Sequence, residues 1–77
     1  MKEKLLALLG EIRPDVDFEK EKLLIDGDVL DSFDIISIVA EMNDTFDIEI
    51  DIDELKPYNF NTIEAMMELI QKLQAQE

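Results

Sequence analysis

Apolar residues recur at helical spacing in three separate segments of this 77-residue chain. They follow the pattern i, i+3, i+4, i+7 in residues 2–13, and they form wider stripes in residues 32–46 and 61–74. The stripes are Leu5, Leu8, Leu9 and Ile12; Ile35, Ile38, Val39, Met42 and Phe46; and Ile63, Met66, Met67, Ile70 and Leu73. Because each stripe must be buried against another element, the sequence predicts an all-α bundle of three principal helices, as one domain over residues 1–77.

A fourth, short helix is expected near residues 51–56. The preceding stretch alternates three isoleucines with acidic residues, which is typical of a strand, but no second strand is available to pair with it. We therefore expect an extended segment that leads into the short helix, with Leu55 as its anchor and Pro57 as its end.

Residues 14–30 form a long connection, and loops of this length in so small a domain are often functional. We expect Phe18, Leu23 or Leu24, and Leu30 to pack it onto the helices. The sequence Asp-Gly-Asp at 26–28 predicts a turn with Gly27 at positive φ.

Local sequence patterns also predict where the last helix begins and where the first helix ends. Asn61 followed by Glu64 is the pattern of a capping box at the start of the last helix, whose polar tail after Leu73 is expected to fray. Pro14 is expected to end the first helix at Arg13, and Gly10 weakens that helix by about 1 kcal/mol relative to alanine.

Composition excludes several classes of function. The chain has no cysteine and no histidine, so it has no disulfide, no thiolate metal site and no Ser-His-Asp triad. Its apolar runs are far shorter than the roughly 20 residues of a membrane span, and its first residues lack a secretory signal, so we expect a soluble, cytoplasmic protein. A net charge of −13 would repel nucleic acids and anionic membranes and favour partners with basic surfaces.

The acidic clusters do not form a recognisable metal or phosphate site. An EF-hand loop started at Asp15 or at Asp47 has Lys20 or Ile52 where the turn glycine is required. The two isolated glycines cannot form a phosphate-cradling loop. We therefore assign no metal and no catalytic residue, and interpret the acids as a solvated surface.

The junction between the long connection and the second helix carries the strongest local signal. With Asp31 as N-cap, Asp34 falls at N3, where its carboxylate can bond back to the cap residue. Ser32 is then the first helical residue, and its hydroxyl is free to serve as an attachment point. The alternative interpretation is that Ser32 is itself the cap or an ordinary polar residue.

This junction resembles the carrier-protein family, which includes acyl, D-alanyl, aryl and peptidyl carrier proteins. The resemblance rests on residues 27–33, read as a turn glycine, an aliphatic residue, the Asp31-Ser32 pair and a large apolar residue. It extends along the chain through Ile36, Ile38, Val39, Met42, Phe46, Ile50 and residues 61–63. The order of helices, the length and the acidity are also similar to those of the family.

The resemblance implies a carrier rather than an enzyme. A phosphopantetheinyl transferase would move 4′-phosphopantetheine from coenzyme A to Ser32, and the thiol of this covalent cofactor would hold cargo as a thioester. Asp31 would belong to the motif, and Asp31 and Asp34 would repel the phosphate modestly while helping to recruit the transferase and its Mg²⁺.

The expected partners are the transferase, a cargo-loading ligase or acyltransferase, and acceptor enzymes with basic surfaces; we expect a monomer. Phe33, Ile36 and Ala40 lie off the main apolar stripe of the second helix, which suggests a second apolar face for a partner, although a fully buried central helix would show the same periodicity. Asp34, Glu41 and Asp44 would steer basic surfaces toward this face.

Two departures from the family bear on the pathway. Phe33 stands where many fatty-acid carriers have leucine, and Ser37 stands where they often have an acid. Residues 29–33 look closer to stand-alone D-alanyl carriers and related secondary-metabolism carriers than to fatty-acid carriers. The alternatives to a carrier are an unmodified acidic helical interaction module and a cation-binding protein without EF-hands.

Overall fold

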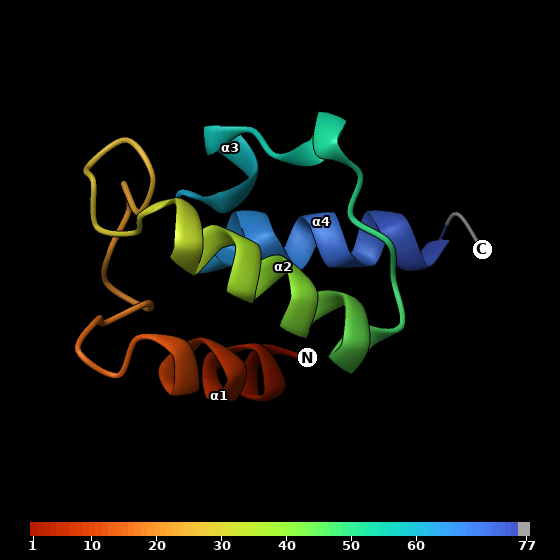
Figure 1. Ribbon diagram of the computed structural model, residues 1–77. Helices are drawn as coiled ribbons and strands as arrows, with labels where there is room; N and C mark the ends of the chain where they lie inside the picture. The colour runs from red at the N-terminus through yellow and green to blue at the C-terminus, as the bar shows by residue number, and fades with distance from the viewer. Residues whose placement is uncertain (76–77) are drawn as a thin grey trace.

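Three long helices and a short one form the fold, and none of residues 1–75, which the structure describes, lies in a strand (Figure 1). In this computed structural model the elements are α1 (Lys2–Ile12), α2 (Ser32–Phe46), a 3₁₀ turn η1 (Ile52–Glu54), α3 (Pro57–Phe60) and α4 (Ile63–Ala75). α1 packs mainly against α2, α4 contacts both, and α3 packs on α4. Figure 1 shows α3 on the opposite side of the bundle from α1. The predicted all-α bundle is confirmed.

The core lies where the apolar stripes of α1, α2 and α4 meet. Fully buried side chains come from each of these helices: Leu5 and Leu9, Ile38 and Met42, and Ile63, Met66 and Ile70. No polar or charged side chain is buried among the described residues. Apolar burial and close packing therefore supply the stability of the interior.

The long connection between α1 and α2 is packed onto the helices, as predicted. Phe18, Leu24 and Leu30 are 3 %, 0 % and 5 % exposed, whereas Leu23 is 56 % exposed. The N–H of Leu24 donates to the carbonyl of Asn61 at 3.0 Å, and the N–H of Leu30 donates to the carbonyl of Leu24 at 2.9 Å. The segment before α2 is thus fixed by two buried leucines, Leu24 and Leu30, and their backbone hydrogen bonds.

The prediction of a positive φ at Gly27 is wrong. The residue in the left-handed region is Asp28, with φ of 58°, and aspartate is one of the few non-glycine residues that tolerate this conformation. Gly27 has a different reason to be glycine. Its N–H donates to the carbonyl oxygen of Leu23 at 2.7 Å, and a Cβ at position 27 would lie only 2.5 Å from that oxygen.

Gly27→Ala is expected to lower the free energy of unfolding by about 1–3 kcal/mol, because the added methyl group forces the turn away from the Leu23 carbonyl. Gly10→Ala is the control, since a Cβ at position 10 meets no atom within 4 Å. That control should raise stability by about 0.4–1 kcal/mol. Urea unfolding followed by circular dichroism measures both, and an unchanged Gly27→Ala protein would contradict the close approach.

The segment between α2 and α4 differs from the prediction in one respect. It begins extended, as expected, but the short helix is α3 rather than a helix at 51–56, where only the turn η1 forms. Pro57 begins α3 instead of ending a helix, because its fixed φ and missing N–H suit the first helical position. Phe60, at 2 % exposure, anchors the segment, whereas Leu55 is 39 % exposed.

The predicted capping box at the start of α4 is also wrong. Thr62 is adjacent to the first residue of α4, and its Oγ1 accepts the N–H of Ala65 at 3.0 Å. The Asn61 side chain instead holds the long connection: its Oδ1 accepts the N–H groups of Ile25 and Asp26 at 2.9 and 3.0 Å, and its Nδ2 donates to Asp26 Oδ2 at 2.9 Å. A residue chosen for helix capping therefore supports the loop that leads to α2.

The remaining differences concern helix ends. Glu64, the other half of the predicted box, pairs with Lys22 at 3.3 Å. α4 continues past Leu73 to Ala75, so fraying directly after Leu73 is not seen, and the last part of the predicted tail, residues 76–77, lies outside the described residues. α1 ends at Ile12, one residue before the predicted Arg13, which is its C-cap.

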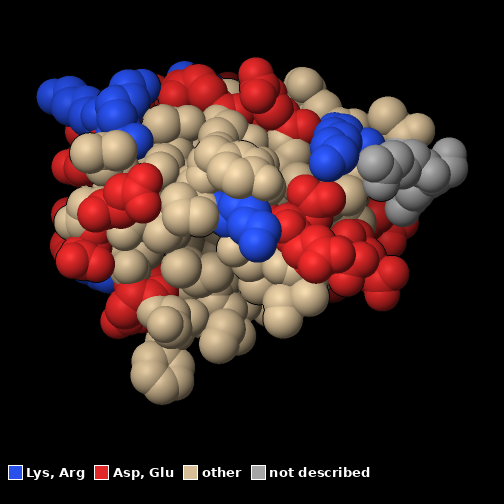
Figure 2. All heavy atoms as spheres, turned by 90° about the horizontal axis from the view of Figure 1, so that it is seen from above, with Lys and Arg blue, Asp and Glu red and all other residues tan. Residues whose placement is uncertain are grey.

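Acidic side chains greatly outnumber basic ones on the surface. The chain has 20 acidic and 7 basic residues, and Figure 2 shows acidic groups at the left, top and right of the face that carries α3, a few basic groups among them, and an uncharged area from its middle to its lower edge. The molecule measures 33 × 23 × 20 Å. The Debye length is about 30 Å at 0.01 M salt and about 8 Å at 0.15 M, so at low salt every charge interacts with all the others.

Raising sodium chloride from about 0.01 M to about 0.15 M is expected to raise the thermal midpoint, because salt screens this self-repulsion. A gain of about 1 kcal/mol would move the midpoint of a domain of this size by roughly 4–8 °C. Differential scanning calorimetry measures the midpoint at each salt concentration. A midpoint that did not change with salt would contradict a mutually repelling surface.

Candidate functional site

Asp31 and Asp34 cap the start of α2, and Ser32 takes no part in the cap. Asp31 Oδ1 accepts the N–H of Asp34 at 2.9 Å, and Asp34 Oδ2 accepts the N–H of Asp31 at 3.1 Å. This reciprocal pair is the predicted capping box, with Asp31 as N-cap and Asp34 at N3. Ser32 is therefore the first residue of the helix and not its cap, which rules out one alternative interpretation of this residue.

The side chain of Ser32 is exposed, and no hydrogen bond joins its hydroxyl to any residue that the structure describes. The chain has no histidine to act as a base for it. The hydroxyl is thus accessible, and no base among the described residues is hydrogen-bonded to it. A negatively charged group on this oxygen would lie at the positive end of a 15-residue helix, where it is stabilised.

Arg13 connects the end of α1 with the start of α2. Its Nη1 donates to Asp34 Oδ2 at 2.6 Å and to the carbonyl of Val29 at 3.2 Å. Its Nε and Nη2 donate to the two carboxylate oxygens of Asp15 at 3.0 and 2.9 Å. Hydrogen bonds to Asp15 first and then to Asp34 raise the pKa of Arg13, while the Arg13 hydrogen bond lowers the pKa of Asp15.

This arginine changes the electrostatics predicted for the site. The Asp34 side chain is 14 % exposed and shares its carboxylate between Arg13 and the helix cap. Its negative charge is therefore partly offset by Arg13, which it shares with Asp15, and it is less available to repel a phosphate on Ser32 or to attract a partner. Arg13 could not be identified from the sequence, because its acceptors on Asp34 and Val29 lie 21 and 16 residues away along the chain.

The predicted apolar face of α2 is exposed to solvent. Phe33 is 81 % and Ile36 66 % exposed, and Ala40 is exposed one turn further along. Helical spacing places these three residues on one side of the helix, and Glu41 and Asp44, both exposed, lie beside them. The alternative of a fully buried central helix is therefore wrong. Unlike these acids, Asp34 is directed toward Arg13.

A cleft of about 230 Å³ opens beside the first turns of α2. Its walls come from the long connection, α2 and the segment that begins α3: Ile25, Ile35, Leu55, Lys56, Pro57 and Phe60. The lining is apolar except for one lysine. Drug-sized ligands occupy pockets of about 300–1,000 Å³, so this cleft accepts only a smaller group.

Among residues 1–75, no helix combines the length and the apolar composition needed to cross a bilayer. Over the same residues, no group of three or more histidine, cysteine, aspartate or glutamate side chains is arranged to hold a metal ion.

Comparison with known proteins identifies the family. Residues 27–70 match the family model described as phosphopantetheine attachment site. The chain is also similar to a D-alanyl carrier protein of Streptococcus uberis, with 32 % identity over 60 residues that cover 78 % of this chain and 76 % of that protein. No solved structure matches the chain significantly. The matches and the all-α fold agree: the chain belongs to the phosphopantetheine-binding carrier proteins, which are not catalytic themselves and use 4′-phosphopantetheine as their prosthetic group.

Proposed function

We propose that Ser32 is the attachment residue and that the chain acts as an acyl or aminoacyl carrier domain. The observation that carries the proposal is the exposed Ser32 hydroxyl at the first position of α2, left free because Asp31 and Asp34 cap the helix between themselves. A phosphodiester fits this position, since the helix end favours an anion and Arg13 partly offsets the charge of Asp34. When bound, the prosthetic group supplies a thiol that holds an acyl group as a thioester.

The cleft beside α2 supports a small cargo. Ile35 lies one turn beyond Ser32 on α2 and lines the cleft, so a group delivered from the attachment site has an apolar pocket close by. The volume of about 230 Å³ suits a short acyl or aminoacyl group. The similarity to a D-alanyl carrier protein supports the same class of cargo. We place the carrier in a cell-wall, lipid or secondary-metabolite pathway.

The exposed face of α2 is the proposed docking surface for the enzymes that load and unload the carrier. Phe33, Ile36 and Ala40 supply an apolar centre, and Glu41 and Asp44 supply negative charge beside it. Partners with basic surfaces, namely a phosphopantetheinyl transferase, a loading ligase or acyltransferase and an acceptor enzyme, would be steered to this face.

The test is the intact mass of the protein after incubation with coenzyme A, Mg²⁺ and a broad-specificity phosphopantetheinyl transferase. One added phosphopantetheine is expected on the parent protein and none on Ser32→Ala. A thiol assay gives a second readout, because the chain has no cysteine and any thiol that follows the reaction must belong to the attached group.

The matched control is Ser37→Ala, which removes the other serine of the chain from an exposed position on the same helix. This variant should be modified like the parent. Modification of Ser32→Ala, or its loss in Ser37→Ala alone, would assign the attachment to a different residue. No modification by several transferases would favour an unmodified interaction module.

Replacing Phe33 by alanine is expected to leave stability within about 0.5 kcal/mol, because its side chain is 81 % exposed. The same change should raise the KM of the transferase for the protein, since it removes most of the apolar centre of the docking face. Steady-state modification rates, measured beside thermal unfolding, separate the two effects. An unchanged KM would place the docking surface elsewhere.

A further inference from the structure

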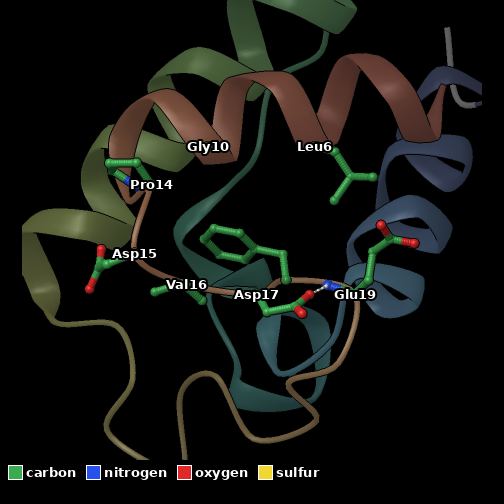
Figure 3. Close-up of a pocket in the computed structure, with 8 residues that line it drawn as sticks. Leu6, Gly10, Pro14, Asp15, Val16, Asp17 and Glu19 are labelled. Atoms are coloured by element: carbon green, nitrogen blue, oxygen red, sulfur yellow. Dashed lines mark hydrogen bonds between the residues drawn. The ribbon is translucent and has the colours of Figure 1, made fainter.

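A groove lies on the α1 side of the molecule, and no residue of α2 lines it. Leu6 and Gly10 of α1 form one wall, Pro14, Val16 and Phe18 form the floor and the other wall, and Asp15, Asp17 and Glu19 stand along it. Its volume is about 420 Å³, larger than the cleft beside α2. Figure 3 shows Leu6 pointing from α1 into the space between the helix and the segment 14–19.

Gly10 keeps this groove open, and folding does not require it. Its φ is not positive, and a Cβ at this position would meet no atom within 4 Å. A glycine in a helix costs stability, so one that neither adopts a special backbone conformation nor makes a close approach has no packing reason to be there. What its missing side chain leaves is free space in the wall of the groove.

The acidic residues of the groove differ in how far they are already neutralised. Asp15 is held by Arg13 through two hydrogen bonds, and Glu19 pairs with Lys2 at 3.4 Å. The Asp17 carboxylate accepts one hydrogen bond, from the backbone N–H of Glu19 at 3.2 Å, and forms no ion pair with any of residues 1–75 (Figure 3). These three acids are not arranged to hold a metal ion. The groove thus places half-buried apolar side chains, Leu6 and Val16, next to a carboxylate that has no ion pair among the described residues.

We propose that this groove binds a basic side chain of a partner protein, an arginine or a lysine, with its aliphatic stem over the half-buried Leu6 and Val16 and its cationic head at Asp17. Long basic side chains bury their methylene groups on apolar surface while the charge stays at a polar edge, which is the combination found here. The proposal goes beyond the carrier function, because it holds whether or not Ser32 is modified. It gives the chain a second contact surface, on α1 rather than on α2.

The test is a titration of the full-length, ¹⁵N-labelled protein with N-acetyl-arginine methylamide, followed by two-dimensional NMR at low salt. Saturable shifts are expected at groove residues, above all at Gly10, Val16 and Asp17. The neutral analogue N-acetyl-citrulline methylamide is the control for the probe, and it should give no saturable shift. Equal binding of the citrulline probe would overturn the role of charge.

Three variants complete the design. Gly10→Leu fills the groove from a position where its Cβ meets no atom, so it should fold like the parent and lose the localised shifts. Asp17→Asn should raise the Kd of the arginine probe about two- to fivefold, the range of an exposed ion pair. Asp51→Asn removes the same charge from the distant segment before η1 and should leave that Kd unchanged. Shifts spread evenly over the acidic surface, or binding that persists in Gly10→Leu, would overturn the proposal.

Discussion

Met42→Ala is expected to lower the free energy of unfolding by about 2–5 kcal/mol, the usual cost of cutting a fully buried side chain back to alanine. Met42 is 0 % exposed and lies one turn after Ile38, also fully buried, on the face of α2 that enters the core. A chain of this length has a total stability of roughly 4–12 kcal/mol. The loss would therefore be a large fraction of the whole.

Ile36→Ala is the matched control for this variant, because it also shortens a large apolar side chain of α2 but at 66 % exposure. It should change stability by no more than about 0.5 kcal/mol. Urea denaturation followed by circular dichroism gives both values. A loss of only a few tenths of a kcal/mol in Met42→Ala would mean that the inward face of α2 has been assigned wrongly.

The three long helices could be predicted because the signal for them is local. Apolar side chains spaced for one helical face must be buried, and a chain of 77 residues offers few ways to bury three such faces. The start of α2 was equally predictable, since a capping box connects residues only three positions apart. Such patterns depend on spacing within one element and not on which elements later meet.

The features that were predicted wrongly depend on contacts between distant residues. Asparagine is a residue type that often caps helices, but the side chain of Asn61 instead accepts the N–H groups of Ile25 and Asp26, which lie 36 and 35 residues away along the chain. Thr62 is then left to cap α4. A proline can mark either the end of one helix or the first turn of the next. Here Pro57 begins α3, because this helix places Phe60 in the core.

The candidate site likewise has some features that depend on local sequence and others that depend on contacts between distant residues. Ser32 and Asp31 could be named from the sequence because their geometry is set within one helical turn. The role of Arg13 could not be predicted from the sequence, since its 2.6 Å contact with Asp34 forms only when α1 packs beside the start of α2. The cleft near Ile35 depends likewise on where α3 lies. Sequence thus identified Ser32 as the proposed attachment residue, and packing determined its surroundings.

Leu24→Ala should also cost about 2–5 kcal/mol, although Leu24 lies outside any helix. Its side chain is 0 % exposed, its N–H donates to the carbonyl of Asn61, and its carbonyl accepts the N–H of Leu30, so it fixes the connection that leads to Ser32. The neighbouring Leu23, at 56 % exposure, provides an internal control of identical chemistry: Leu23→Ala should stay within about 0.5 kcal/mol.

Amide hydrogen exchange shows which parts of the structure are destabilised by Leu24→Ala. If the connection is part of the cooperative core, the variant should lower protection throughout α1, α2 and α4, because opening the loop exposes the buried faces of the helices it covers. If only the amides of residues 24–30 lost protection, the connection would be an independent unit laid over a core that is stable without it. The first result would mean that the position of Ser32 is held by the whole fold, through a loop that contains no regular secondary structure.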